Sequence, residues 1–299
     1  MDQLSIMRIY VAVAEAQGFA AAARHLKISP PAVTRAVSAL EDKLGVKLLT
    51  RTTRHVRTTD AGRRYLDDAR RILHDVERAD AAAIGINAEP KGLLSITAPV
   101  LFGQKFVMPG IVEYLNAYPD TQVNAVFLDR VVNLLEEGFD VGIRIGKLPD
   151  SNMYATVVGK VRLILVASPE YLAKYESPKD PKDLLKHCLI SANAGSMAHD
   201  WHFNSGEKKQ SIHIHPRLVV TSNQAAINAS CEGLGITRLI SYQVADELAA
   251  GTLNTILEDY EPEPMPVHIL HREGHRASSK VRCFIALMTK HLRDDTNFQ

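Results

Sequence analysis

The chain is poor in cysteine and has no long apolar run, and each shortage excludes a class of protein. Its 299 residues include only three cysteines, Cys188, Cys231 and Cys283, and their odd number and wide spacing predict neither a disulfide framework nor a metal site. No uncharged apolar stretch approaches the roughly 20 residues of a membrane-spanning helix. Charged residues also interrupt the N-terminal helical pattern, which argues against a signal peptide. We therefore expect a cytoplasmic protein that has no membrane partner.

Motifs typical of common hydrolases and metalloenzymes are also absent. No serine lies in a G-x-S-x-G turn and no H-E-x-x-H segment occurs. Histidines gather at 199–202, 213–215 and 268–275, but their loose spacings do not match a metal site. The glycines of 233–235 follow a helical segment instead of opening one, which does not fit a phosphate-binding loop. We expect no enzymatic activity, no metal and no cofactor.

Charge is nearly balanced over the whole chain but unevenly distributed along it. The net charge is +1. Residues 1–66 carry 11 Lys and Arg against 5 acidic residues, whereas the remainder carries 24 against 29. A basic N-terminal part on a slightly acidic protein indicates a local contact with nucleic acid.

Residues 18–59 predict two helices joined by a tight turn. Ser29 can cap the second helix, and prolines at 30 and 31 fit its first turn. One face of this helix is apolar, and the opposite face carries short polar side chains and one arginine: Pro31, Thr34, Arg35 and Ser38. Such a helix can read base edges in a major groove, although an ordinary solvated face would look the same.

A Thr-rich basic segment follows at 47–57 and predicts a short hairpin, or wing. Its positive side chains include Lys47, Arg51, Arg54 and Arg57. Phosphate contacts from a wing would position the protein on DNA without reading its sequence.

A long helix is predicted from a cap at Thr59 or Asp60 to about Glu89. Apolar residues recur along it at alternating steps of four and three, which is the heptad pattern of a two-stranded coiled coil: Tyr65, Ala69, Ile72, Val76, Ala79 and Ala83. We expect this seam to form a homodimer; the alternative is that the helix packs on its own domain. Two identical reading helices would match a roughly palindromic operator.

From Leu93 onward, strands and helices alternate, which predicts a parallel sheet flanked by helices. Helices are expected at 99–116, 131–137, 224–232 and 280–292. Strands are expected at 93–97, 122–128, 139–145, 163–168, 188–191, 218–223 and 267–271, with a polar hairpin at 201–215. Two such α/β lobes joined by crossing strands would enclose a cleft.

Two strand-to-helix junctions, at 97–100 and 221–224, place hydroxyl and amide groups beside free backbone N–H donors. Helix N-termini favour anions such as carboxylates. Each junction alone is explained as well by a plain helix cap, and only their pairing favours a ligand. Leu128, Asp129 and Arg144 end two other strands and could complete the site.

Taken together, these motifs resemble the LysR-type transcriptional regulators over the whole chain. The resemblance is most specific at 21–62, with its Ala-rich helix, its S-x-P-A-V-T-R start, its L-E-x-x-L-G-V-x-L segment and T-x-A-G after the wing. SITAPVLFG, EEGFDVGIRIGKLPDS, ILVASPEYL and CEGLGI look like the effector domain, particularly that of the CrgA-like subgroup. The resemblance implies an α+β and α/β protein with a winged helix-turn-helix domain (1–59), a linker helix (60–89) and a two-lobed, periplasmic-binding-protein-like effector domain (90–299). Lobe I would comprise about 92–163 and 267–299, and lobe II about 164–266.

The resemblance also implies partners and site residues. The implied partners are double-stranded DNA, a small-molecule effector and a second copy of the chain, often as a dimer of dimers; RNA polymerase is a further candidate. Contacts with DNA would come from Ser29, Pro30, Pro31, Thr34, Arg35, Ser38, Arg51 and Arg54. The family often has Gln at position 30, and Pro30 cannot make the bidentate bond to adenine that Gln makes. The effector would contact Thr97, Val100, Leu128, Arg144, Trp201 and Asn223.

Two alternatives remain open. The same regulator could respond to oxidants through Cys231 near the end of a helix, although an unpaired cysteine is more often buried and inert. A solute-binding protein would fit residues 93–299 but would leave the basic N-terminal segment unexplained.

Overall fold

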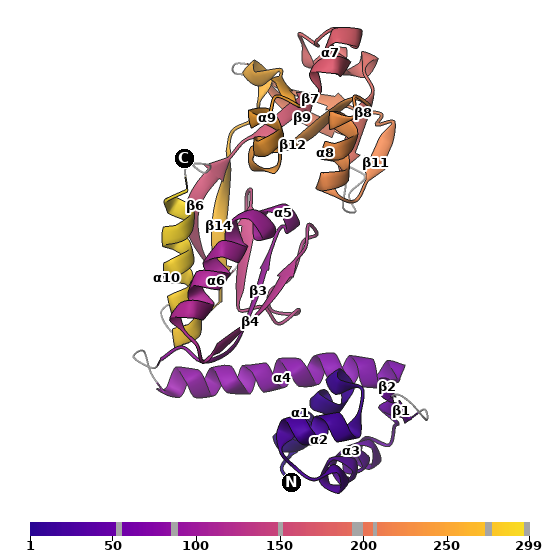
Figure 1. Cartoon of the computed structure of the whole chain (residues 1–299), viewed down its shortest axis with the longest axis vertical. Coiled ribbons are helices and arrows are strands. Elements are labelled where there is room, and N and C mark those ends of the chain that lie inside the picture. The colour runs from indigo at the N-terminus through magenta and orange to yellow at the C-terminus, as the bar shows by residue number, and fades with distance from the viewer. Residues whose placement is uncertain are drawn as a thin grey trace. The chain divides into compact units, whose positions relative to one another are not determined.

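The computed structural model describes residues 1–51, 56–84, 89–148, 152–192, 200–205, 208–272 and 277–295. The chain divides into two compact units, the first formed by Met1–Ile86 with a short piece at 135–138, and the second by the remaining residues (Figure 1). No helix in the described ranges is long and apolar enough to cross a membrane. Over the same residues, no group of three His, Cys, Asp or Glu side chains is placed to hold a metal ion.

The first unit is a winged helix-turn-helix followed by a long helix. Its elements are α1 (Gln3–Ala16), α2 (Phe19–Leu26), α3 (Pro30–Leu44), the antiparallel pair β1 (Leu49–Arg51) and β2 (Val56–Thr58), and α4 (Asp60–Ile84). Its core joins α1, α2, α3 and the hairpin, with Tyr10, Val33 and Leu40 almost fully buried. Ser29 lies at the N-cap of α3 as expected, but its side chain makes no capping hydrogen bond.

Helix α4 is anchored at its start by Thr59. The Thr59 Oγ1 accepts a hydrogen bond from the Gly62 N–H at 2.9 Å, so Thr59 and not Asp60 caps the helix. Farther along, Ala69 and Leu73 are buried against Met7 of α1. The helix is followed through Ile84, and Glu89 is no longer helical; the residues between lie outside the described part of the chain.

The second unit contains two five-stranded sheets. The first, lobe I, has the strand order β4-β3-β5-β14-β6. Helix α10 and the helical run from α5 to α6 pack against it, as Figure 1 shows. The bounds are β3 (Gly92–Ala98), α5 (Val100–Phe102), a π-helical turn (Gly103–Val107), α6 (Met108–Ala117), β4 (Thr121–Phe127), β5 (Val141–Ile145), β6 (Tyr154–Val161), β14 (Met265–His271) and α10 (Ser279–Arg293).

The second sheet, lobe II, has the strand order β11-β8-β12-β7-β13. Apolar side chains of α8 cover one face, and the hairpin β9-β10 with α7 covers the other. The chain passes between the lobes twice, at Arg162 and at 261–264. The bounds are β7 (Leu163–Ala167), α7 (Pro169–Tyr175), a 3-10 helix (Pro181–Lys186), β8 (Leu189–Ala192), β9 (Asp200–Ser205), β10 (Lys208–His213), β11 (Leu218–Val220), α8 (Asn223–Cys231), β12 (Ile236–Ile240), short 3-10 helices (Ser241–Val244 and Glu258–Tyr260), α9 (Ala245–Ala249) and β13 (Asn254–Ile256).

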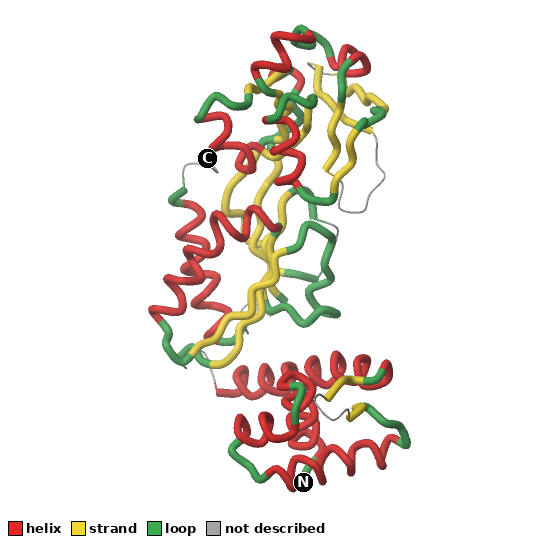
Figure 2. The backbone as a smooth tube through the Cα atoms, turned by 45° about the vertical axis from the view of Figure 1, so that its right-hand side comes forward, coloured by secondary structure: helices red, strands yellow, loops and turns green. Residues whose placement is uncertain are grey.

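Two expectations about this unit are wrong. Both sheets are mixed, because β14 runs antiparallel to β5 and β6, and β7 runs antiparallel to β12 and β13. The expected helix at 131–137 is a loop, visible beside the sheet in Figure 2. Val132 and Leu134 of this loop are buried with Phe139 and with Leu270 of β14, whereas Val131 is 95% and Leu135 45% exposed, so the apolar residues do not form one buried helical face.

Candidate functional site

The expected DNA-reading face of α3 is open to solvent. Pro30, Pro31 and Arg35 are exposed, and Thr34 and Ser38 are partly exposed. The opposite face of α3 is held by the core, where the side chains at 33, 37 and 40 are at most 1% exposed. Ser29 at the start of the helix is also exposed. The structure therefore presents these residues as one accessible stripe on a firmly packed helix.

The wing forms as predicted, although its tip lies outside the described residues. Leu49 pairs with Thr58 and Arg51 with Val56, so Arg51 lies at the end of β1. Arg54 is among the residues that are not described. On the opposite strand, Arg57 is exposed and provides a positive charge on the described part of the wing.

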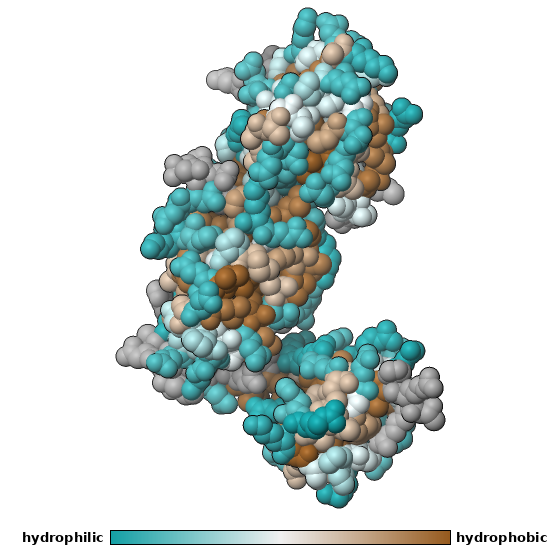
Figure 3. Space-filling view, in the orientation of Figure 1, coloured by the Kyte–Doolittle hydropathy of each residue, from teal (hydrophilic) through white to brown (hydrophobic). Residues whose placement is uncertain are grey.

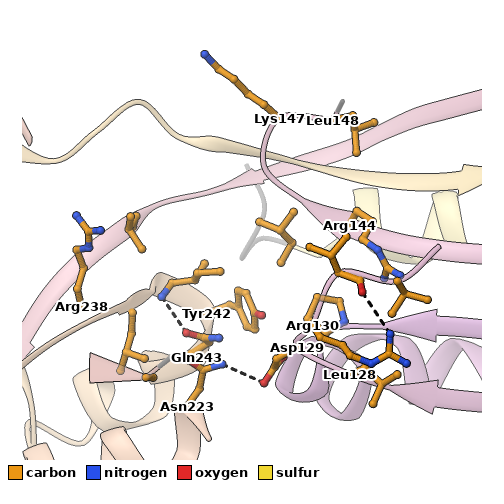
Figure 4. A pocket seen from close by; sticks show the side chains of 18 of the residues that line it. Leu128, Asp129, Arg130, Arg144, Lys147, Leu148, Asn223, Arg238, Tyr242 and Gln243 are labelled. Carbon is orange, nitrogen blue, oxygen red and sulfur yellow. Dashed lines mark hydrogen bonds between the residues drawn. The ribbon is translucent and has the colours of Figure 1, made fainter. Parts of the chain in front are cut away.

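A cavity of about 790 Å³ lies between the two lobes of the second unit (Figure 4). Of the six expected effector contacts, four line it: Leu128, Arg144, Trp201 and Asn223. The other two do not. Thr97 is completely buried in the sheet, and the backbone N–H of Val100 donates to Asp129.

A carboxylate of the protein itself occupies both strand-to-helix junctions. Asp129 Oδ1 accepts a hydrogen bond from the Val100 N–H at 2.9 Å, and its Oδ2 accepts one from the Asn223 amide at 3.2 Å. Figure 4 shows the second of these bonds. Asp129 thus joins the two junctions, through a backbone N–H of the first and the side-chain amide of the second.

Arg238 is one of several cavity residues that are not among the contacts expected from sequence. It lies on β12, with its guanidinium 4.9 Å from the ring centroid of Trp201 and 6.0 Å from that of Phe203. Its Nη1 donates to the backbone oxygen of His202 at 3.3 Å. Burial lowers the pKa of Arg238 to about 10, which still leaves it cationic at neutral pH. The signal in the sequence is that Arg238 is the single charged residue of the strand segment ITRLI.

Tyr242 closes one side of the cavity. It is 2% exposed and packs edge-on against Phe102 and Phe106 of lobe I. Burial, and to a smaller extent the charge of Asp129, raises the pKa of Tyr242. The phenol therefore stays protonated and can donate a hydrogen bond to a ligand.

Cys231 lies at the C-terminal end of α8 beside the apolar cluster under that helix. Burial raises the pKa of its thiol, and the charge of Glu247 raises it further. Because the thiolate is the reactive form, this environment slows oxidation.

The expected coiled-coil seam on α4 is divided between two environments. Tyr65 packs edge-on against Tyr10 at 5.4 Å and Ala69 is fully buried on α1, so these two contact the chain's own domain. Ile72 is 38% exposed, Val76 is partly exposed and Ala79 is exposed. The side chain of Ala83 lies outside the described set.

A second apolar surface lies on the second unit. Figure 3 shows apolar side chains gathered over α6, where Met108 is 39% and Val112 52% exposed.

Comparisons with known proteins match both units. The model of the bacterial regulatory helix-turn-helix protein, lysR family, matches residues 4–63, and that of the LysR substrate binding domain matches residues 87–293. An uncharacterized HTH-type transcriptional regulator from Haemophilus influenzae is 31% identical over 282 residues, covering 94% of this chain and 98% of that protein.

Two solved structures are similar to almost the whole chain. AphB, a virulence activator of Vibrio cholerae and a member of the LTTR family, is 26% identical with a TM-score of 0.65, covering 97% of this chain and 99% of that one. CrgA, a LysR-type transcriptional regulator from Neisseria meningitidis, is 27% identical with a TM-score of 0.61, covering 96% and 98%.

Proposed function

Because the chain belongs to the LysR family of DNA-binding transcriptional regulators, we propose that it regulates transcription in response to an anionic small molecule bound between its two lobes. The observation that carries this proposal is Arg238. Its guanidinium is half-buried against two aromatic rings, and in the described part of the chain it has a carbonyl oxygen but no carboxylate as a partner.

The charge of the cavity supports an anionic effector. Four basic side chains line it, against the two carboxylates Asp129 and Asp200: Arg130, Arg144, Lys147 and Arg238. Arginine binds carboxylates through two parallel hydrogen bonds. The stacked guanidinium of Arg238 is half-buried and held in place by the two rings, so it loses little conformational freedom when it binds such a group.

The size and polarity of the cavity suit a small metabolite. A volume of about 790 Å³ lies within the usual range of small-molecule sites. Its apolar wall includes Leu128, Leu134 and Met153, and polar groups such as the Tyr242 hydroxyl and the Asn223 amide face the same space (Figure 4). An organic acid with an apolar body and at least one carboxylate fits this combination.

For DNA binding we propose that Thr34, Arg35 and Ser38 read bases, with Ser29, Pro30 and Pro31 at the mouth of the groove. Their joint exposure on α3 supports this assignment. The wing would contact phosphates through Arg51 and Arg54, and we add Arg57, which is exposed on β2, as a third contact.

For assembly we propose a homodimer formed through the exposed part of the α4 seam, with the apolar surface over α6 available to join dimers into a tetramer. Similarity to CrgA extends over almost the whole chain, which supports placement in a CrgA-like subgroup. The same proposal divides the chain into a DNA-binding domain at 1–59, a linker helix at 60–89 and an effector-binding domain at 90–299.

The effector proposal is testable with the chain's own fluorescence. Trp201 is the only tryptophan and stacks on Arg238, so a ligand bound to Arg238 should change its emission. We would titrate small organic acids, each with its neutral amide as a matched compound. Loss of a charge-assisted hydrogen bond in Arg238→Gln should weaken a binding acid by about 10- to 150-fold.

Arg217→Gln is the control, because Arg217 is an exposed arginine of the same lobe that does not line the cavity. It should bind like the unmodified chain. Amides that act as strongly as their acids, or an acid whose affinity survives Arg238→Gln, would contradict the proposal.

Redox sensing through Cys231 is the weaker alternative. The raised pKa of its thiol leaves little thiolate at neutral pH, whereas the cavity offers a binding site that needs no chemical change in the protein.

A further inference from the structure

The last turns of the reading helix contain a buried acidic residue. Glu41 lies on α3 and is 7% exposed. Ionised side chains are rarely buried unless paired, and its neighbour Asp42 on the same helix is exposed. Contact with water therefore does not explain an acidic residue at position 41, and its partners within the protein must.

The carboxylate of Glu41 binds the start of the wing. Its Oε1 accepts hydrogen bonds from the N–H groups of Leu48 at 2.9 Å and Leu49 at 3.1 Å. Its Oε2 accepts one from Lys47 Nζ at 2.7 Å. The backbone oxygen of Glu41 also accepts the Val46 N–H at 3.2 Å. One residue of α3 thus binds four successive residues that lead into and begin β1.

Ionisation of Glu41 is maintained by these contacts. Burial alone would raise its pKa, but the hydrogen bonds from Lys47, Leu49 and Leu48 together outweigh burial and lower it. Hydrogen bonds to an ionised acceptor are the strong ones, so the joint between α3 and the wing is stiff.

The start of α4 is bonded to the same segment that leads into β1. Thr59 donates its N–H to the Leu48 oxygen at 2.9 Å and its hydroxyl to the Lys47 oxygen at 2.8 Å. A Cβ on Gly62 would meet the Leu48 oxygen at 1.9 Å, so α4 approaches β1 as closely as backbone allows. Glu41 therefore lies where the reading helix, the wing and the long helix meet.

We propose that Glu41 is a positioning residue for DNA binding, whose buried carboxylate holds the wing at a fixed position relative to the reading helix so that both contact one DNA duplex. Glu41 touches no DNA itself. It acts through the backbone of Leu48 and Leu49, and its loss should uncouple the phosphate contacts of the wing from those of α3. The inference rests on the proposed DNA contacts of the wing.

The experiment uses the full chain and a random-sequence duplex of about 30 base pairs, so no operator needs to be known. Affinity is measured by fluorescence anisotropy over a range of salt concentrations. Arg57→Ala reports the contribution of the wing, because Arg57 is exposed on β2. One lost phosphate contact lowers the magnitude of the salt slope by about 0.9.

We expect Arg57→Ala to lower the slope by about 0.9 in the unmodified chain, but by less than half of that when Glu41→Gln is also present. The glutamine side chain introduced there would keep a similar shape, with an amide oxygen able to accept one N–H. Asp42→Asn is the matched control, since it removes the same charge from the adjacent position; the effect of Arg57→Ala should be undiminished in its presence.

Hydrogen exchange at Leu48 and Leu49 shows whether the joint has opened, and should quicken in Glu41→Gln but not in Asp42→Asn. If Glu41→Gln fails to fold, Glu41→Asp replaces it, because it keeps the charge and shortens the reach. The proposal is overturned if Arg57→Ala costs the same slope with and without the Glu41 substitution. If Arg57→Ala leaves the slope of the unmodified chain unchanged, the proposed phosphate contact of Arg57 fails, and with it the role of Glu41 in positioning that contact.

Discussion

Replacing Ile72 by alanine should weaken dimerisation while leaving the fold of the first unit intact. Ile72 is 38% exposed, whereas Ala69 is fully buried on α1. Full burial of an isoleucine is worth about 1.5–3 kcal/mol, so the fraction still exposed can yield about 0.6–1.1 kcal/mol per chain against a partner. Two chains contribute in a symmetric dimer. Alanine should therefore raise the dissociation constant by about 7- to 50-fold.

Sedimentation velocity over a wide range of protein concentration measures this change, with circular dichroism as the check on folding. Ile72→Asp should go further and leave monomers at micromolar concentration, because two carboxylates would face each other in the seam. Asp68→Asn is the control: Asp68 is an exposed residue of α4 whose pair is Arg71, three positions along the same helix. A sedimentation mass that is the same for the unmodified chain and Ile72→Asp would refute the seam.

Three further outcomes are expected. Arg35→Ala should weaken specific DNA binding by about 1–3 kcal/mol if Arg35 contacts a base. Arg51→Ala should weaken binding to all duplexes alike and lower the salt slope by about one. Equal losses of affinity for specific and random DNA in Arg35→Ala would contradict its reading role. Cys231→Ser should leave any response to a thiol oxidant unchanged, measured by footprinting on a bound promoter. Burial lowers the pKa of His187 and of His271 below 6.5, so as the pH falls the unfolded chain takes up protons before the folded chain does. The free energy of unfolding should therefore decrease as the pH drops from about 6.5, which is measured as a lower urea midpoint of unfolding by tryptophan fluorescence. His187→Gln should reduce that decrease.

The reading helix could be predicted because its signals are local. Prolines in the first turn and an apolar stripe of helical spacing are properties of a few adjacent residues. Ser29 shows the limit of this reasoning: it occupies the cap position, but its hydroxyl makes no capping bond. The choice between Thr59 and Asp60 as the cap of α4 was likewise open until the bond from the Gly62 N–H decided it.

The cavity was predicted less completely because it is built from contacts distant in sequence. Strand ends at 128 and 144 and the helix start at 223 were recognisable, and all three line the cavity. Thr97 and Val100 belong to a similar junction, but burial in the sheet removes the first and a bond to Asp129 occupies the second. The mixed sheets were missed because an antiparallel neighbour such as β14 arrives from the far end of the chain.

Helix α4 can pack against its own domain and against a partner chain at once, because the two stripes of side chains that make these contacts point in different directions. At about 100° per residue, Ala69 and Ile72 lie about 60° apart around the helix axis. The first stripe packs on α1 through Ala69 and Leu73, and the second, with Ile72 and Val76, is left for another chain. Helix α1 in turn packs against both α3 and α4. A dimer formed through the second stripe would therefore set the distance between two reading helices through rigid packing, and the spacing of operator half-sites would follow from the geometry of that one helix pair.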